Sequence, residues 1–365
     1  MEYAFTSEEK DVREAGRRFI DDHATEDGWS EENPGAYDRS VYAQMADLGF
    51  FGLAATEGAG GLGMSHLAEG LVLEAAGYRL FRGPLLEHYA ALEALSMEPG
   101  LAEHAGKNIS GERLATIGFG WRGPHSVASA VSDGATFDGA GIAGHLGTVD
   151  DAVVVAAGPD HTVMIALFDR NSLAVEDVAD ADYSWSAGRF DLTGSAPAAF
   201  ATVSSEQGQS MLALAGALAA AYSLGCAQRL LDDTVGYVGD RTQFGRPIGS
   251  FQAIKHSVAD LYIEIEHAKS LVYAAIATDD IGAATQLRLM AKSAMDTSLA
   301  LTTRVALQSH GGIGFTWESH IHRFVRASLR LGRWPMSSSN VTQSILDAAL
   351  QGTGTHTHSN EGNDS

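Results

Sequence analysis

Cysteine is nearly absent from this chain, since Cys226 is the single cysteine among 365 residues. One cysteine cannot close an intramolecular disulfide, and its scarcity is typical of proteins in a reducing compartment. Cys226 lies in an apolar, alanine-rich run, which favours a small buried core residue over a reactive nucleophile.

Basic residues and membrane-directed segments are also scarce. The chain has 24 Lys and Arg against 46 Asp and Glu, giving a formal net charge of −22. That charge repels the phosphates of nucleic acids and anionic membrane surfaces. The segment that begins Met1–Ala4 lacks the basic stretch followed by an apolar stretch that is typical of a secretory signal. No apolar run approaches the ~20 residues that are needed to span a bilayer. We therefore expect a cytoplasmic protein that binds neither nucleic acid nor membrane.

Acidic residues, abundant elsewhere, are missing from two windows of the C-terminal half. No Asp or Glu occurs from Ser319 to Leu346, nor from Gln207 to Leu231. Proton abstraction in enzymes commonly uses a positioned carboxylate. Neither window can supply one.

Periodicity divides the chain into three regions and a tail. Helical spacing of apolar residues predicts helices over residues 1–110 and again over 206–351. Between them, residues 111–205 carry short apolar runs separated by turn residues, which predicts a small antiparallel β domain. The polar, glycine-rich tail 352–365 is predicted to be disordered.

One glycine motif is discounted. Gly58–Gly63 matches the G-x-G-x-x-G pattern of nicotinamide-binding proteins, which requires a preceding strand. Helical segments flank the motif here, so a structural loop is favoured.

Two segments carry the most specific motifs. They are Arg241-Thr242-Gln243-Phe244-Gly245-Arg246-Pro247-Ile248-Gly249-Ser250-Phe251-Gln252 and Gln308-Ser309-His310-Gly311-Gly312-Ile313-Gly314-Phe315. Occurring together in this order and spacing, they resemble the FAD-binding signatures of the acyl-CoA dehydrogenase family. The resemblance extends across nearly the whole chain. It implies an α+β fold with an N-terminal helical domain, a central antiparallel β domain and a C-terminal helical bundle.

The chemistry of these residues suits FAD. Arg241 has a planar guanidinium that can bond pyrophosphate oxygens in two places. The glycines at 311 and 312 allow the backbone to approach a cofactor closely. The remaining candidate contacts are Gln243, Phe244, Ile248, Gln252 and Gln308. Taken singly, each segment also reads as an ordinary interhelix turn or a glycine-rich helix end.

In this family FAD lies at a dimer interface. The flavin ring is held by one subunit, and the ADP portion reaches the R-x-x-F-G and Q-x-x-G-G segments of its neighbour. The resemblance therefore implies that this chain keeps the half of the site that is donated across the interface.

The catalytic carboxylate of the family is missing. Its usual place corresponds to Pro335, and an alternative place falls near Ala215, both inside the acid-free windows. The strand that contacts the flavin in this family also differs here, and Thr116 is the only residue that clearly matches the family pattern. His310, His320 and His322 lie near the expected region, but no orienting carboxylate is readable beside them, so surface or interface histidines are favoured over a base or a metal site.

The leading hypothesis is a base-lacking subunit of a heteromeric FAD-dependent acyl-CoA dehydrogenase, with no catalytic residue and no metal of its own. Its expected partner is a catalytic subunit that binds most of the acyl-CoA, in an α2β2 heterotetramer. Similar heteromers act on steroid side chains. The alternatives are a self-sufficient homomeric flavoenzyme with an unconventional base and a non-enzymatic scaffold.

Overall fold

The N-terminal part of the chain is helical. The computed structural model describes residues 3–25, 34–119, 137, 139–278 and 280–353. The first helices are α1 (Ser7–His23), α2 (Arg39–Asp47), α3 (His66–Arg79), α4 (Leu85–Ser96) and α5 (Pro99–Ile109), with short 3-10 turns η1 (Phe50–Gly52) and η2 (Glu57–Ala59). Thr6 and Glu9 form a capping box that starts α1. The G-x-G-x-x-G motif falls on η2 and the turn after it, preceded by η1 rather than a strand.

Two sheets follow. The strands are β1 (Ala115–Phe119), β2 (Ala140–Gly144), β3 (Asp151–Ala157), β4 (Val163–Asp169), β5 (Ala174–Val178), β6 (Ala187–Asp191) and β7 (Ala199–Val203), with short 3-10 turns η3 (Pro159–His161) and η4 (Arg170–Ser172). One sheet has the order β1-β3-β4-β7 and the other the order β2-β6-β5. The pair β1–β3 is parallel, so the expectation of a wholly antiparallel β domain is wrong at that pair. The reason is that β2 joins the other sheet, and the chain returns to lie beside β1 in the same direction.

The four-stranded sheet is buried on both faces. Alternate residues such as Val153 and Ile165 pack toward the helices, while Val154 and Ala166 pack toward the second sheet. Burial on both faces explains why these strands read as continuous apolar runs.

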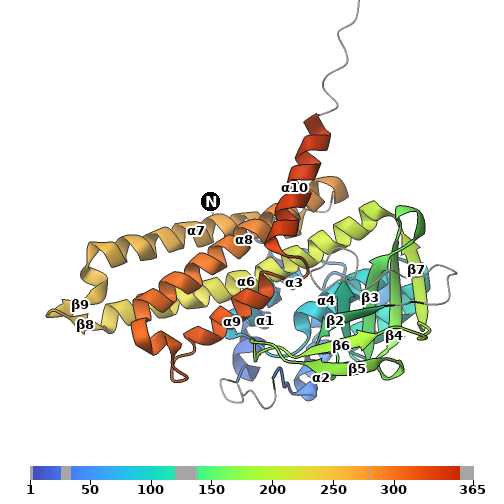
Figure 1. Cartoon of the computed structure of the whole chain (residues 1–365), viewed down its shortest axis with the longest axis horizontal. Helices are drawn as coiled ribbons and strands as arrows, with labels where there is room; N and C mark the ends of the chain where they lie inside the picture. The colour runs from blue at the N-terminus through green and yellow to red at the C-terminus, as the bar shows by residue number, and fades with distance from the viewer. Residues whose placement is uncertain (1–2, 26–33, 120–136, 138, 279, 354–365) are drawn as a thin grey trace, which may run out of the picture.

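The C-terminal bundle is built from long helices (Figure 1). Its elements are α6 (Ser205–Asp240), the hairpin strands β8 (Thr242–Gln243) and β9 (Arg246–Pro247), η5 (Ile248–Ser250), α7 (Gln252–Ala277), α8 (Ile281–His310), η6 (Gly311–Phe315), α9 (Ile321–Leu331) and α10 (Ser338–Thr353). Residues 352 and 353 end α10, and the rest of the tail that was expected to be disordered lies outside the described residues.

Helices α3 and α6 cross where neither carries a side chain. A Cβ added at Gly77 would lie 1.8 Å from the Tyr222 carbonyl oxygen. One added at Gly225 would lie 1.9 Å from the Glu74 carbonyl oxygen. The two glycines therefore allow the backbone of α3 to contact the backbone of α6 directly.

The expectation that no apolar run approaches the length of a membrane span is wrong for α6. This helix has 36 residues and a window with mean hydropathy 1.6, enough by length and composition to cross a membrane. That window is entirely buried inside the protein, which is the place of a core helix.

A half-buried histidine at the start of α3 gives a pH-dependent prediction. Nδ1 of His66 lies 3.0 Å from Glu69, and Nε2 lies 3.6 Å from Glu93. Burial lowers the pKa of His66, but the Glu69 hydrogen bond and the charges of both carboxylates raise it more, to about 9, and the Arg288 charge opposes them weakly. Because the folded-state pKa is raised, the stabilisation is present below pH 6.5 and is lost as pH rises through about 9.

We therefore expect the free energy of unfolding to fall by on the order of 2 kcal/mol between pH 7 and pH 10, and the His66→Gln variant to lack this drop. Urea unfolding across that pH range measures it. Parallel pH profiles for both proteins would refute the assignment.

Candidate functional site

The two motif segments meet at one end of the bundle. Helices α6 and α8 both finish there, and the β8–β9 hairpin projects beyond them (Figure 1). Tyr237, in the last turn of α6, stacks on His310 at the end of α8, with 4.3 Å between ring centroids. The structure thus brings together segments that are about sixty residues apart in the sequence.

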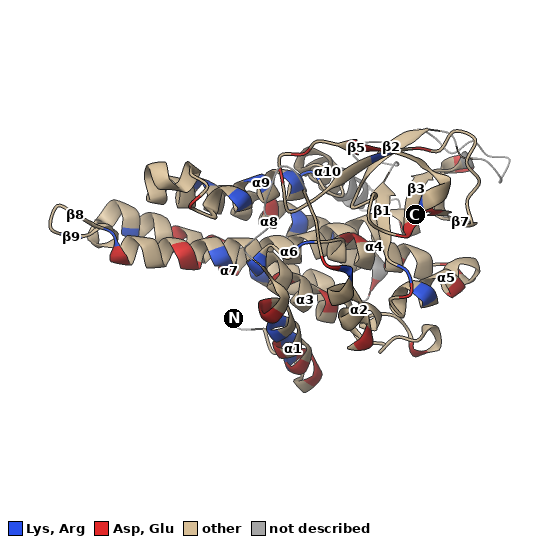
Figure 2. Cartoon of the chain, turned by 90° about the horizontal axis from the view of Figure 1, so that it is seen from below, with Lys and Arg blue, Asp and Glu red and all other residues tan. Residues whose placement is uncertain are grey.

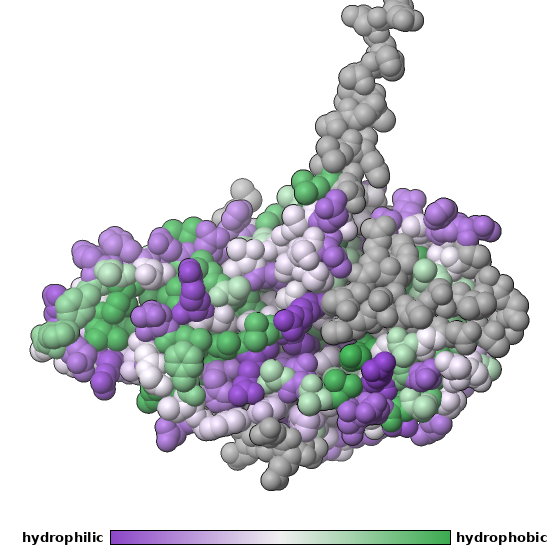
Figure 3. Space-filling view, viewed as in Figure 1, coloured by the Kyte–Doolittle hydropathy of each residue, from purple (hydrophilic) through white to green (hydrophobic). Residues whose placement is uncertain are grey.

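The hairpin is a tight turn with an exposed tip. Arg241 ends α6 and donates its backbone N–H to Tyr237, and its carbonyl accepts from the Ile248 N–H at 2.8 Å. Phe244 and Gly245 adopt positive φ angles of 53° and 77°, as a two-residue hairpin requires. The Phe244 side chain is 92% exposed. Figure 3 shows pale green, moderately apolar surface at this end of the molecule.

The candidate side chains are exposed and available. Those of Arg241, Gln243, Gln252 and Gln308 form no hydrogen bond or ion pair within the described residues. A Cβ added at Gly311 or Gly312 would meet open space, so a ligand could approach the backbone. Ile248 is half-buried beneath the hairpin.

One buried polar group also lies in this segment. The Ser250 hydroxyl has no hydrogen-bond partner within the described residues. A buried polar atom without a partner normally indicates an unseen ligand or water. The donors, the open glycine backbone and this hydroxyl fit the ADP half of FAD.

A cavity of about 230 Å³ lies beside Pro335. It is bounded by β1, the β5–β6 connection and α9, and its polar lining consists of Arg326, Arg330, Arg333 and Asp180. Both tryptophans at its edge, Trp185 and Trp334, present aromatic surface. Pro335, the position where the resemblance predicts the family's carboxylate, therefore borders a cavity lined mainly by guanidinium groups.

Asp180 is the one carboxylate among the described residues that line this cavity, and the sequence analysis missed it because it lies outside both acid-free windows. Its Oδ1 accepts the backbone N–H of Asp182 at 2.8 Å. Asp180 is only half-buried, so it can reach solvent.

Arg330 on α9 forms ion pairs with α4 and with the β5–β6 connection beside this cavity. It is 8% exposed and its Nε donates to Asp182 at 2.8 Å. Glu87 on α4 lies 3.9 Å from the guanidinium and accepts from the Trp185 indole at 2.7 Å. Burial lowers the pKa of Arg330, but the charges of Asp182 and Glu87 raise it more, so the group stays charged.

A second buried ion pair lies between the two acid-free windows. Lys292 donates to Asp296 at 2.5 and 2.6 Å and to the Leu331 carbonyl at 3.0 Å. The Ser338 hydroxyl donates to Asp296 at 2.9 Å. The pair thus fixes both ends of the turn that carries Pro335. An i, i+4 Lys–Asp pattern in an apolar helix was the available signal in the sequence.

The histidines were partly misjudged. The expectation that no carboxylate orients them is wrong for His320, whose Nε2 lies 2.6 Å from Asp233 on α6. His320 does not line the cavity beside Pro335, so the pair is not placed to act there. His310 stacks on Tyr237, and His322 approaches the Ser319 carbonyl at 2.7 Å. Among the described residues, no group of three or more possible ligands could hold a metal ion.

Comparisons with known proteins agree with this architecture. The family model for the acyl-CoA dehydrogenase C-terminal domain matches residues 207–357, and the N-terminal domain model matches residues 6–89. The acyl-CoA dehydrogenase IpdE2 of Mycolicibacterium smegmatis is 31% identical over 324 residues, covering 88% of this chain and 92% of that protein. FadE34 of Mycobacterium tuberculosis is 31% identical over 87% of this chain, but the match spans only 44% of that longer protein.

Solved structures share the fold. A variant of the Tcur3481–Tcur3483 steroid ACAD superposes with a TM-score of 0.86 at 26% identity, covering 95% of this chain and 99% of that one. The ChsE4–ChsE5 complex of Mycobacterium tuberculosis gives a TM-score of 0.83 at 23% identity, covering 96% and 99%. Together with the extended sequence match, the helical and sheet layers place the chain in the acyl-CoA dehydrogenase family, whose cofactor is FAD.

Proposed function

We propose that this chain is the base-lacking subunit of a heteromeric FAD-dependent acyl-CoA dehydrogenase. Its partner would be a catalytic subunit that supplies the carboxylate and binds most of the CoA thioester, in an α2β2 assembly in the cytoplasm. The chain would complete the partner's FAD site through its exposed hairpin and glycine segment. A steroid side chain is the proposed acyl group.

The observation that carries the proposal is the contrast between two parts of the chain. The ADP-side residues at the end of the bundle are exposed and free to bond. The cavity beside Pro335, where a proton acceptor is needed, is lined by three guanidinium groups and a single carboxylate, Asp180, among the described residues. Two structural neighbours, the Tcur3481–Tcur3483 protein and the ChsE4–ChsE5 complex, are named as pairs of different chains, which supports a heteromeric assembly.

The proposed roles of this chain and its partner follow from the charge and polarity of this chain's side chains. FAD, when bound, supplies the hydride acceptor for α,β-dehydrogenation. Arg241 would hold the pyrophosphate, Gln243, Gln252 and Gln308 would bond the polar edges of the ADP half, and Phe244 and Ile248 would cover its apolar faces. Gly311 and Gly312 would allow the backbone to approach. Proton abstraction would fall to the partner.

The deciding experiment measures bound flavin per polypeptide. The chain is purified alone and after co-expression with an acyl-CoA dehydrogenase chain encoded beside it, and flavin is measured by absorbance. We expect no flavin on the isolated chain and about one flavin for every two chains in the complex. One flavin on every isolated chain would overturn the shared-site proposal. No flavin in any assembly would favour the scaffold alternative.

Arg241→Ala tests the cross-interface role directly. Losing a charge-assisted bond of about 1.5–3 kcal/mol should weaken FAD retention by the complex about tenfold to a hundredfold. Flavin release during dialysis measures this, and circular dichroism should show an unchanged fold because Arg241 is exposed. Arg18→Ala, which removes an exposed charge on α1, is the matched control. Equal flavin retention by the two variants would contradict the role.

A homomeric enzyme is the second candidate, and Asp180 favours it, because this carboxylate lines the cavity beside Pro335. If Asp180 were the base, the isolated chain would bleach its flavin with an acyl-CoA and Asp180→Asn would abolish the bleaching. Under the heteromeric proposal, Asp180→Asn leaves the turnover of the complex unchanged.

A further inference from the structure

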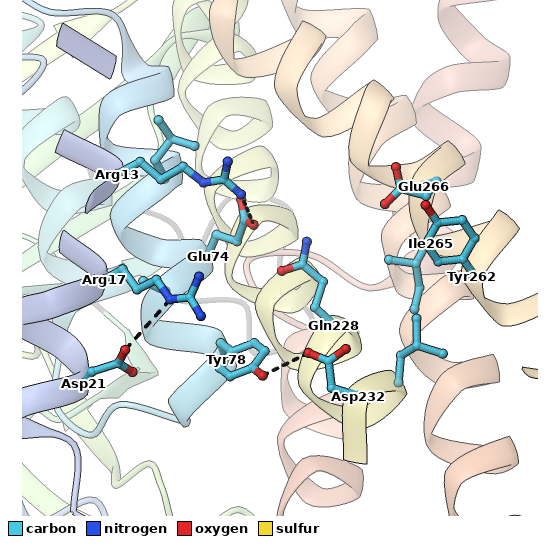
Figure 4. A pocket seen from close by; sticks show the side chains of 13 residues that line it. Arg13, Arg17, Asp21, Glu74, Tyr78, Gln228, Asp232, Tyr262, Ile265 and Glu266 are labelled. Carbon is cyan, nitrogen blue, oxygen red and sulfur yellow. Dashed lines mark hydrogen bonds and ion pairs between the residues drawn. The ribbon is translucent and has the colours of Figure 1, made fainter. Parts of the chain in front are cut away.

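A separate cavity of about 270 Å³ lies on the flank of the bundle, bordered by α1, α3, α6 and α7 (Figure 4). It shares no lining residue with the cavity beside Pro335. The apolar groups of its lining that solvent reaches are Ala75, Tyr78 and Tyr262, of which Tyr262 is 57% exposed, while Leu71, Leu231 and Ile265 are buried. Such a surface can accept a hydrocarbon group from water.

The carboxylates of this cavity are already engaged. Each of the four accepts a hydrogen bond or a close ion pair: Asp21 from Arg79 at 2.6 Å, Glu74 from Tyr273 at 2.6 Å, Asp232 from Tyr78 at 2.9 Å, and Glu266 from Lys269. These groups have little remaining demand for a cationic ligand.

The two arginines of the cavity are only loosely paired. Arg13 lies 3.7 Å from Glu74, and Arg17 lies 3.8 Å from Asp21, both beyond hydrogen-bond length. Arg13 also lies over the Phe5 ring at 5.3 Å, a contact that uses none of its N–H groups. The two residues are one helical turn apart on α1 and enter the cavity from the same side (Figure 4).

The charges around this cavity do not oppose the binding of an anion. Figure 2 shows acidic and basic residues, in red and blue, interspersed along the ribbon of α1. The cations Arg13, Arg17, Arg79 and Lys269 balance the four carboxylates that line the cavity. An anion placed at the arginines therefore meets available guanidinium donors in a neutral surrounding, although the whole chain is acidic.

We propose that this cavity binds a small monocarboxylate with an apolar body, of about the size of octanoate. The carboxylate would bond Arg13 and Arg17, and the hydrocarbon would cover Ala75, Tyr78 and Tyr262. The site is independent of the FAD proposal, since none of its residues belongs to the two motif segments.

The test compares three probes of equal length on the full chain, alone and in its co-purified complex, by isothermal titration calorimetry. Octanoate should bind, 1-octanol should bind at least about tenfold more weakly, and octylamine should not bind. Affinity should fall about threefold to fourfold for each CH2 removed, from octanoate to hexanoate to butanoate.

Charge removal locates the site. Arg17→Gln should weaken octanoate binding about threefold to tenfold, and Arg13→Gln/Arg17→Gln should abolish it. The matched control is Arg18→Gln on the same helix, since Arg18 pairs with Glu14 and does not line the cavity. All three positions are on an exposed helix face, and unchanged thermal unfolding would verify that the variants are folded.

Three results would overturn the proposal. They are equal binding of octanoate and octanol, binding of octylamine, and octanoate affinity that is the same in the double variant as in the unmodified chain. The last result would show that octanoate binds elsewhere.

Discussion

Arg330→Met is expected to destabilise the folded chain by about 3–5 kcal/mol, a large part of the stability of a typical domain. The substitution keeps the volume of the side chain but removes the cation that faces two buried carboxylates. Asp182 is 0% exposed and Glu87 is 1% exposed, so neither can recover full hydration. Removing one partner of a buried ion pair is costly because it leaves an uncompensated charge. Urea unfolding followed by circular dichroism measures the loss.

The loss should depend on pH. Burial raises the pKa of the Glu87 carboxyl, and the Arg330 charge opposes that rise. Without the guanidinium, protonation of Glu87 relieves part of the penalty, so the deficit should shrink as pH falls toward 5. Arg18→Met, which breaks an exposed pair with Glu14, is expected to change stability by at most about 1 kcal/mol. A deficit for Arg330→Met as small as that of the control would show that the two carboxylates are solvated.

Lys292→Met is expected to have a similar effect of about 3–5 kcal/mol. Lys292 and Asp296 have side chains that are 1% and 6% exposed, and Lys292 donates to both carboxylate oxygens. Its loss also frees the Leu331 carbonyl at the end of α9. Chemical unfolding again measures the change, and a shift in Trp334 fluorescence should report the loosened turn.

A double variant keeps this prediction decisive. Lys292→Met/Asp296→Leu removes both charges and should recover most of the stability, because an apolar pair can replace a buried ion pair. Lys269→Met, whose partner Glu266 is partly exposed, should cost at most about 1 kcal/mol. If the double variant were less stable than Lys292→Met, the charge argument would be wrong.

Much of the architecture could be predicted from residues close together in the sequence. The two motifs indicated the family and hence the order of the helical and sheet regions, and Cys226 is the buried core residue that its apolar surroundings suggested. Helical and strand periods are local properties, which single sequences reveal well. The acid-free windows carry the hypothesis that a catalytic base is missing, which stays a prediction.

What could not be predicted depends on distant partners. His320 meets Asp233 across 87 residues, and Arg330 meets Asp182 across 148. To predict the parallel pairing of β1 with β3, one would have to know that β2 belongs to the other sheet. Asp180 was missed because it reaches the cavity from the β domain, outside any local pattern. Such contacts are set by tertiary packing rather than by sequence spacing.

The crossing of α3 and α6 has a consequence for recombining this chain with its relatives. Gly77 and Gly225 stand 148 positions apart, yet each leaves room for the other helix's backbone. A chimaera joined anywhere between them inherits one glycine from each parent. It can assemble only when both parents have a residue without a side chain at their half of the crossing, so exchange of the N-terminal helices is governed by two single positions.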